Sequence, residues 1–157
     1  MSRAFVKEQD DAPEQLLERP VSANPNLVTA RGLIQIDAEL ERLRQDLAKA
    51  QHDADKALIA RASRDLRYWT KRRSSAQLVE PPSTPDIVGF ATRVTVLRDG
   101  KQRTFDIVGE DEADPARGLI AYSSPMARVL LGKDVGEVAE IAGGEIEITA
   151  VSSIAGT

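Results

Sequence analysis

The 157-residue sequence contains no cysteine, which excludes disulfide bonds, thiolate metal sites and cysteine nucleophiles. It also lacks any run approaching the roughly 20 apolar residues that span a bilayer, and its N-terminus lacks the apolar core of a signal peptide. We therefore expect a cytoplasmic protein that does not enter membranes. His52 is the only histidine, so a histidine-rich zinc site cannot be assembled, and we expect it in an exposed turn.

Aromatic residues are scarce, at 4% of the chain, so a β core must be built from Val, Ile and Leu. Hydrophobic residues at 41% and charged residues at 29% are typical of a soluble, folded protein. The formal net charge of −4 argues against broad electrostatic attachment to nucleic acid. We expect any nucleic acid to be reached through another protein.

Prolines divide the chain into segments. Residues 1–26 are polar, acidic and interrupted by three prolines, which predicts a flexible N-terminal arm. The sequence EPPSTPD at residues 80–86 carries three more prolines and predicts a linker. Two domains are then expected, one over residues 27–79 and one over residues 87–157.

The first domain has a helical pattern. Thr29 is a suitable N-cap for a helix that begins near Ala30. Apolar residues then recur at alternating spacings of three and four, which predicts a heptad seam; they are Leu33, Ile36, Leu40, Leu43, Leu47 and Ala50. A second seam follows, with Ile59, Ala62, Leu66 and Trp69. The short polar connection at residues 52–55 predicts an antiparallel coiled-coil hairpin.

After Asp86 the apolar period changes to two, which indicates strands at residues 93–97, 104–108, 119–121 and 145–151. Asp99 and Gly100 predict a tight hairpin turn, because both central residues of a type I′ turn need positive φ. Ser124 is expected to cap a short helix with Pro125 at its first position. The predicted class is α+β, with a helical hairpin followed by a mostly antiparallel sheet that carries one short helix.

Five ordered blocks of sequence, spread over about residues 26–151, resemble the GreA/GreB family of transcript-cleavage factors. The blocks are NLVTARGL at 26–33, SAQLV at 75–79, IVGEDEAD at 107–114, SPMARVLLGKDVGE at 124–137 and GGEIEI at 143–148. The resemblance implies an FKBP-like fold for the C-terminal domain.

The resemblance also implies a function. In that family the C-terminal domain docks on the rim of the RNA polymerase secondary channel, and the coiled coil points its tip at the active centre. Two acidic tip residues help to hold the second Mg²⁺, so that the polymerase itself cuts a backtracked RNA. This chain would then be a monomeric accessory factor of RNA polymerase, not an enzyme, with no cofactor of its own.

The hairpin departs from the family pattern. It is several turns shorter than the usual arm, and the acidic motif D-x-x-E followed by N-A-[ED]-Y is absent. Asp53 and Asp55 are the candidate catalytic carboxylates at its tip; they would either share the polymerase Mg²⁺ or serve as caps and helix-dipole partners. A short-armed regulator that binds without cleavage, resembling the regulator of nucleoside diphosphate kinase type, is the alternative.

A second candidate site matches the family segment that touches the polymerase. It comprises Ser123, Ser124, Pro125, Met126 and Arg128, with Ser123 where some relatives carry an acidic or amide residue. The other interpretation is that Ser-Pro starts a helix and Met126 packs beneath it. Both interpretations are compatible.

Two charged clusters are open to two interpretations each. GEDEAD at residues 109–114 is either a solvated turn or a site for a cation or a basic partner. The basic second helix, residues 61–73, is either a solvent-facing helix or a face suited to a negatively charged channel. Trp69 is expected to pack in the seam.

Two functions of other classes compete with transcription regulation. An FKBP-like fold suggests a prolyl isomerase, for which the C-terminal domain supplies only Phe90, Phe105 and Tyr122 as pocket aromatics. The heptad seam alternatively suggests an adaptor that pairs with another chain.

Overall fold

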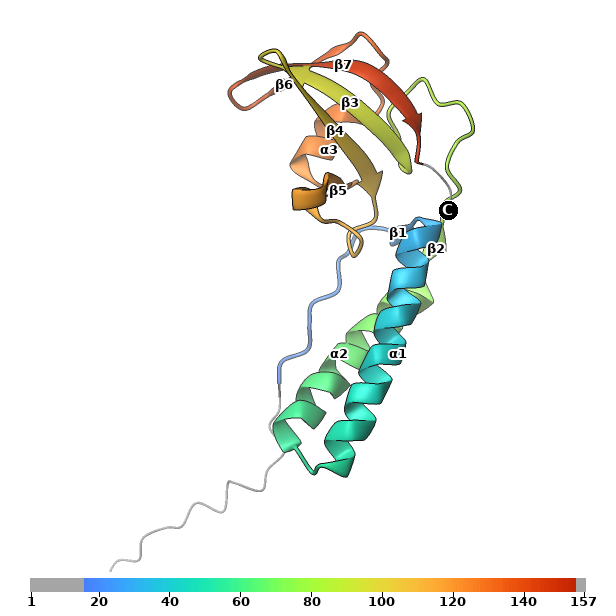
Figure 1. Ribbon diagram of the computed structural model, residues 1–157, viewed down its shortest axis with the longest axis vertical. Coiled ribbons are helices and arrows are strands. Elements are labelled where there is room, and N and C mark those ends of the chain that lie inside the picture. Colours follow the sequence, from blue (N-terminus) through green and yellow to red (C-terminus); the bar gives the residue numbers. More distant parts are fainter. Residues whose placement is uncertain (1–15, 155–157) are drawn as a thin grey trace, which may run out of the picture.

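A computed structural model describes residues 16–154 of the chain. Two antiparallel helices form a rod, and a curled sheet crossed by a short helix sits at one end of it (Figure 1). The α+β class expected from the sequence is confirmed.

The rod consists of α1 (Ala30–His52) and α2 (Lys56–Ser75). Thr29 caps α1 as predicted, because its hydroxyl accepts a hydrogen bond from the Gly32 N–H at 3.0 Å. Asp55 caps α2 in the same way, accepting from the Leu58 N–H at 3.1 Å. Only residues 53–55 connect the helices, which forces them to be antiparallel neighbours.

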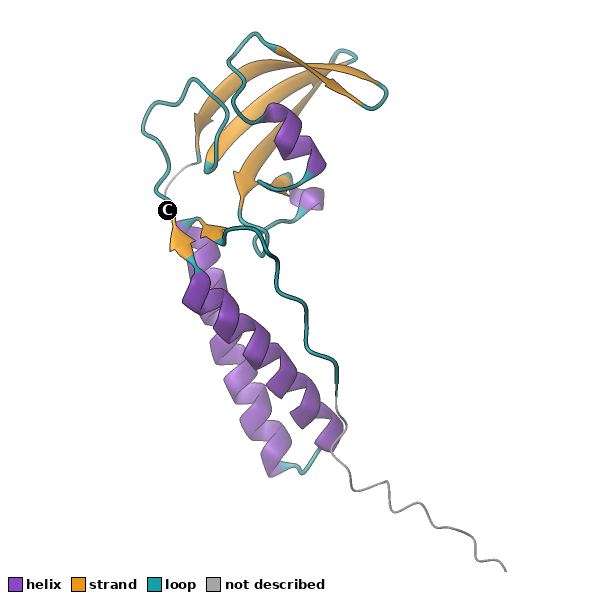
Figure 2. Ribbon diagram, turned by 180° about the vertical axis from the view of Figure 1, so that it is seen from behind, coloured by secondary structure: helices purple, strands orange, loops and turns teal. Residues whose placement is uncertain are grey.

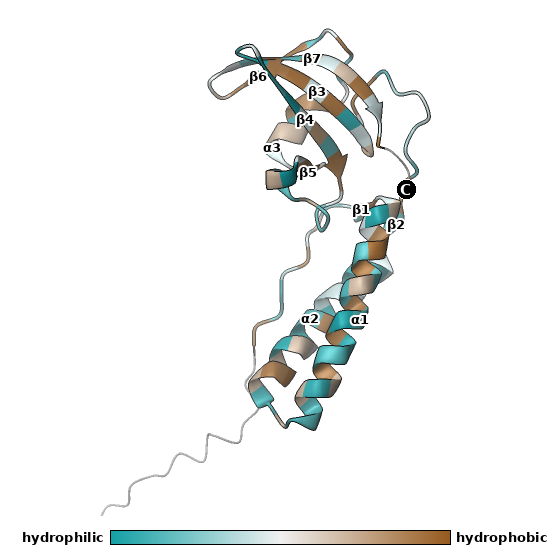
Figure 3. Cartoon of the chain, viewed as in Figure 1, coloured by the Kyte–Doolittle hydropathy of each residue, from teal (hydrophilic) through white to brown (hydrophobic). Residues whose placement is uncertain are grey.

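The two predicted seams pack against each other along the rod. Ile36, Leu40 and Leu43 are buried on α1, and Trp69 packs from α2 against the same cluster, as expected. Hydrophobic positions therefore recur among hydrophilic ones along both helices (Figure 3). Because side chains of α2 pack against Ile36 and Leu40, this part of the seam is not available to the partner of an adaptor.

The sheet domain has five strands in the order β5-β4-β3-β7-β6. Their bounds are β3 (Thr92–Arg98), β4 (Lys101–Val108), β5 (Leu119–Ala121), β6 (Val138–Ile141) and β7 (Gly144–Ser153). The β3–β4 turn is the predicted one, with φ of 49° at Asp99 and 75° at Gly100. Among the described strands of this sheet, β4 and β5 alone pair in parallel, so the expected mostly antiparallel sheet is confirmed.

A helix, α3 (Pro125–Leu130), packs against the concave face of the curled sheet (Figure 2). Its start is the predicted one, since the Ser124 side chain accepts from the Ala127 N–H. Ala127 and Leu130 are fully buried against the aliphatic core of the sheet. A 3-10 helix, η2 (Pro115–Arg117), precedes β5, and residues 80–86 form an irregular connection.

A two-stranded parallel sheet that the sequence did not reveal lies at the base of the rod. It pairs β1 (Leu27–Val28) with β2 (Gln77–Leu78), and Val79 N–H donates to the Val28 carbonyl at 2.9 Å. These strands belong to two of the family-like blocks, NLVTARGL and SAQLV. The pairing joins the start of α1 to the end of α2, and so closes the hairpin where it meets the sheet domain.

A buried polar network fastens α2 to the sheet domain. Arg72, only 2% exposed, donates from Nε to Asp111 at 2.6 Å and from a terminal nitrogen to the Asn26 side chain at 2.8 Å. The Tyr68 hydroxyl donates to the other oxygen of Asp111 at 2.7 Å. A buried charge is tolerated only when it is paired and hydrogen-bonded, and here each partner comes from a different segment.

The start of α1 meets the same loop at close range. The Thr29 hydroxyl donates to the buried Glu112 carboxylate at 2.5 Å. A Cβ on Gly32 would lie 2.8 Å from that carboxylate, and a Cβ on Gly109 would lie 2.3 Å from the Leu27 carbonyl oxygen. Glycine at both positions therefore allows the two domains to touch.

Both interpretations of GEDEAD are wrong for two of its carboxylates. Asp111 and Glu112 are not exposed to solvent and are not available to a cation or a partner protein. Arg72 donates a hydrogen bond to Asp111, and Thr29 donates one to Glu112. The solvent-facing interpretation of the basic helix is likewise wrong for Arg72. In the sequence, buried charged residues such as Arg72 cannot be distinguished from surface residues, because their bonding partners are distant in the chain.

The sequence predicted a flexible arm over residues 1–26, of which the structure describes residues 16–26. These follow a defined path beside α2 (Figure 1). The Arg19 guanidinium lies 3.9 Å from the centre of the Tyr68 ring, and the Tyr122 hydroxyl donates to the Pro25 carbonyl at 2.5 Å. Polar and cation–π contacts hold residues 16–26 against α2 and the sheet domain, although this segment has few buried apolar groups.

We predict that Gly109→Ala lowers the free energy of unfolding by about 2 kcal/mol, because the new methyl group collides with the Leu27 backbone. Urea denaturation measures the change. Gly89→Ala is the matched control, since nothing lies within 4 Å of its Cβ position. Equal stability of the two variants would contradict the close approach.

A second prediction concerns alkaline pH. Burial, the hydrogen bond to Asp111 and the charge of Asp111 raise the pKa of Tyr68 from 10.0 to about 12. Because the folded-state pKa is the higher one, this contribution to stability is complete below pH 10 and is lost as the pH rises to about 12. The stability difference between the wild-type chain and Tyr68→Phe should therefore shrink over this window. Parallel stability curves would refute the assignment.

Candidate functional site

The tip of the hairpin is an exposed turn that carries both predicted carboxylates. Asp53 is the C-cap of α1, Ala54 follows with a φ of 52°, and Asp55 is the N-cap of α2. Asp53 is exposed, whereas Asp55 uses one oxygen to hold the Leu58 N–H. The capping role predicted for Asp55 is therefore present in the structure, and it leaves Asp53 as the freer carboxylate.

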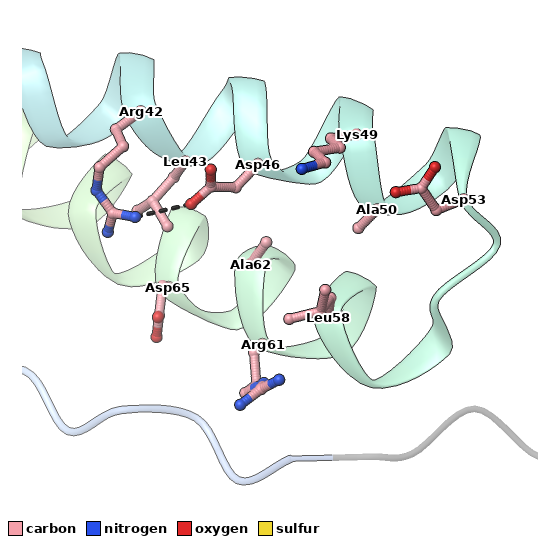
Figure 4. A pocket seen from close by; sticks show the side chains of 10 residues that line it. All are labelled: Arg42, Leu43, Asp46, Lys49, Ala50, Asp53, Leu58, Arg61, Ala62 and Asp65. Atoms are coloured by element: carbon pink, nitrogen blue, oxygen red, sulfur yellow. Dashed lines mark hydrogen bonds and ion pairs between the residues drawn. The ribbon is translucent and has the colours of Figure 1, made fainter.

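A groove of about 350 Å³ opens between the helices next to the tip (Figure 4). Small side chains, Ala50 and Ala62, line its floor where larger ones would fill the space between the helices. Asp53 lies at one end, and Lys49 and Arg61 also line the groove. The groove is therefore lined by charges of both signs, with the tip carboxylate at its end.

The segment matched to polymerase binding lies at the start of α3. Pro125 and Arg128 are exposed, whereas Met126 packs against the core of the sheet domain. Ser124 is occupied as the helix cap. Ser124 and Met126 therefore build the helix, as the second interpretation expects, whereas Pro125 and Arg128 face solvent, and their contact with the polymerase stays a prediction.

Ser123 has a partner that sequence reasoning missed. Its hydroxyl donates to Glu110 Oε2 at 2.8 Å. Burial alone would raise the pKa of Glu110, but hydrogen bonds from neighbouring side chains, Ser123 among them, and the charge of Arg72 together keep that pKa below its ordinary value. The sequence block IVGEDEAD contains Glu110, but no local sequence pattern distinguishes this carboxylate from the acidic residues beside it.

The basic face of α2 is partly neutralised within the chain. Arg73 pairs with Asp37 of α1 at 2.7 Å, and Arg67 pairs with Glu18. Two other acidic residues of α1, Glu39 and Asp46, pair along their own helix with Arg42.

The aromatic side chains of the sheet domain are used in packing. Phe105 is 5% exposed within the core. Phe90 and Tyr122 meet edge to face, with ring centres 5.9 Å apart. This arrangement gives the prolyl isomerase hypothesis no support.

Residues 16–154 include no helix with the length and apolarity needed to cross a membrane. In the same residues, no group of three or more histidine or acidic side chains is placed to hold a metal ion.

Comparison with known proteins places the chain in a family. The family model described as "Transcription elongation factor, GreA/GreB, C-term" matches residues 82–153, which include all five strands of the larger sheet and α3.

Similarity to individual relatives extends beyond that domain. Transcription elongation factor GreA of Alkalilimnicola ehrlichii is 34% identical over 144 positions, which cover 76% of this chain and 91% of the relative. GreA of Maricaulis maris is 33% identical over 135 positions, covering 73% of this chain and 86% of the relative. Since 73% of 157 residues is about 115, about 20 of those 135 positions have no counterpart here.

Among solved structures, GreA factor homolog 1 of Thermus thermophilus aligns over 83% of this chain and 100% of its own, at 21% identity and a TM-score of 0.39. The sequence similarity to the two GreA proteins spans 86% and 91% of their length and, at 73% and 76% of this chain, extends beyond the sheet domain. The chain belongs to the GreA/GreB family of transcription elongation factors.

Proposed function

We propose that this chain binds RNA polymerase at the secondary channel and regulates elongation by occupying that channel with its hairpin. The observation that carries the proposal is the shape of the molecule, in which a closed helical rod projects from the family's sheet domain and ends in an exposed acidic turn (Figure 1). The sheet domain would grip the rim of the channel, while the rod would enter it. Any nucleic acid is then reached through the polymerase.

The hairpin is short for a factor that reaches the active centre. The 23 residues of α1 give a helix of about 35 Å, at 1.5 Å per residue. If the alignment positions without a counterpart fall in the hairpin, each helix has lost roughly ten residues, or about 15 Å of reach. Occupation of the channel therefore fits this rod better than contact with the catalytic metal ions.

The chemistry of the tip favours the same outcome. Stimulating cleavage requires carboxylates that are free to recruit the second Mg²⁺ of the polymerase. Asp55 is engaged as a helix cap, and Asp53 lines a groove together with Lys49 and Arg61. Cleavage by the polymerase with help from Asp53 and Asp55 is the second candidate function.

The proposed binding surface on the sheet domain centres on Arg128. This side chain is exposed on α3, and Lys133 lies near it in a shallow groove beside β6. Ser123 and Ser124 would act by fixing the start of α3, through Glu110 and the helix cap respectively. Pro125 is exposed beside them, and Met126 anchors the helix from below.

We expect stalled, backtracked polymerase to retain full-length RNA after addition of this protein, and active polymerase to elongate more slowly. A double variant with Asp53→Asn and Asp55→Asn should behave like the wild type, because asparagine preserves the cap but removes the charge. Gel analysis of labelled RNA distinguishes the outcomes. Shortened RNA with the wild type and unshortened RNA with the variant would instead establish cleavage.

We further expect Arg128→Glu to weaken binding to core RNA polymerase about tenfold, because it reverses an exposed charge at the proposed interface. Lys101→Glu makes the same change of charge at the exposed β3–β4 turn and serves as the control. Co-purification and surface plasmon resonance measure the affinities. Equal weakening by both variants would show that net charge, and not this surface, controls binding.

A further inference from the structure

One segment of the chain contacts both the basic face of α2 and the sheet domain next to the start of α3. Arg64, Arg67 and Lys71 lie three and four residues apart, so they share one face of α2. Residues 16–25 run beside this helix in both views of the molecule (Figures 1 and 2). An acidic residue of the segment, Glu18, lies among these basic side chains.

The contacts with α2 are ionic and aromatic. Glu18 accepts from Arg67 Nε at 2.7 Å, and this bond is the main reason that the pKa of Glu18 lies below its ordinary value. Arg19 stacks on the Tyr68 ring and approaches Asp65 at 3.5 Å. The segment thus places an anion on the basic face and a cation on the neighbouring aromatic ring.

The other end of the segment reaches the sheet domain. The Asn24 side chain donates to Glu110 Oε2 at 3.3 Å, and this same oxygen accepts from Ser123. The Tyr122 hydroxyl donates to the Pro25 carbonyl. The segment therefore also contacts Glu110 and Tyr122, next to Ser123 and the start of α3.

These contacts are weak compared with those at the adjacent Asn26. Leu17 and Val21 are 91% and 41% exposed, so the segment gains little from apolar burial, and exposed ion pairs contribute little. Asn26, by contrast, is 5% exposed and bonded to Arg72. Residues 16–25 can therefore detach while Asn26 stays in place.

We propose that residues 16–25 form an autoinhibitory strap. In place, the strap pairs Glu18 with Arg67 on the basic face of α2 and Asn24 with the Glu110–Ser123 contact. When it is displaced, Arg67 is free to bind phosphate groups and the Glu110–Ser123 contact is open to the polymerase. The polymerase part rests on the proposed function. The contact of the strap with the basic face of α2 can be tested without polymerase.

The decisive variant is Arg19→Ala in the full chain. It makes the protein more negative, so net charge alone predicts weaker binding of a polyanion, whereas loss of the strap's stacking contact predicts stronger binding. We expect a short fluorescein-labelled single-stranded RNA to bind this variant roughly two- to fivefold more tightly than the wild type, by fluorescence anisotropy. Arg44→Ala, which removes an exposed charge on α1, should bind no more tightly than the wild type. Failure of Arg19→Ala to bind more tightly, or to bind at all, would overturn the strap.

A complementary pair tests the acidic contact. Glu18→Gln and Glu41→Gln each remove one negative charge, but only Glu18 touches the basic face. Glu18→Gln should raise RNA affinity more than Glu41→Gln, and equal effects would contradict the strap. The same variants are assayed with core RNA polymerase. If no variant binds polymerase while the RNA difference persists, the proposed function fails and the strap stands.

Discussion

The buried ion pair between Arg72 and Asp111 is the constraint on which the arrangement of the molecule depends. The two residues are 39 positions apart, and Asn26, 46 positions from Arg72, completes the arginine's bonding. Such a pair adds little net stability over an apolar substitute, but leaving either charge alone is costly. The hairpin is therefore held in one orientation on the sheet domain, and the proposed entry of the rod into the polymerase channel requires such a fixed base.

The parts of the fold that could be predicted from the sequence are those set by local chemistry. The heptad seams, with Ile36 and Leu40 on α1 and Leu66 and Trp69 on α2, identified both helices, and Asp99-Gly100 identified the β3–β4 turn. Thr29 and Ser124 marked helix starts because a capping hydroxyl acts within three residues. In each case the interacting atoms are neighbours in the chain, so the residue types reveal the structure.

The parts that could not be predicted depend on distant partners. Arg72 looks like its basic neighbours on α2, and Glu112 looks like any acidic turn residue, until Asp111 and Thr29 bind them. The strands β1 and β2 are two residues each, too short for a period to show. At the candidate site, Arg128 was recognised by resemblance, whereas the Glu110 bond to Ser123 joins two loops and left no local pattern.

The molecule divides its contacts between a firm base and a weakly held outer part. At the base, large side chains such as Ile36 and Leu40 fill the seam, and Gly109 lets the domains touch. Toward the tip, Ala50 and Ala62 leave an open groove, and along α2 the outer segment is held by exposed charges. Because exposed charges are easily screened or replaced while buried packing is not, a partner can remodel the tip and the strap without loosening the base.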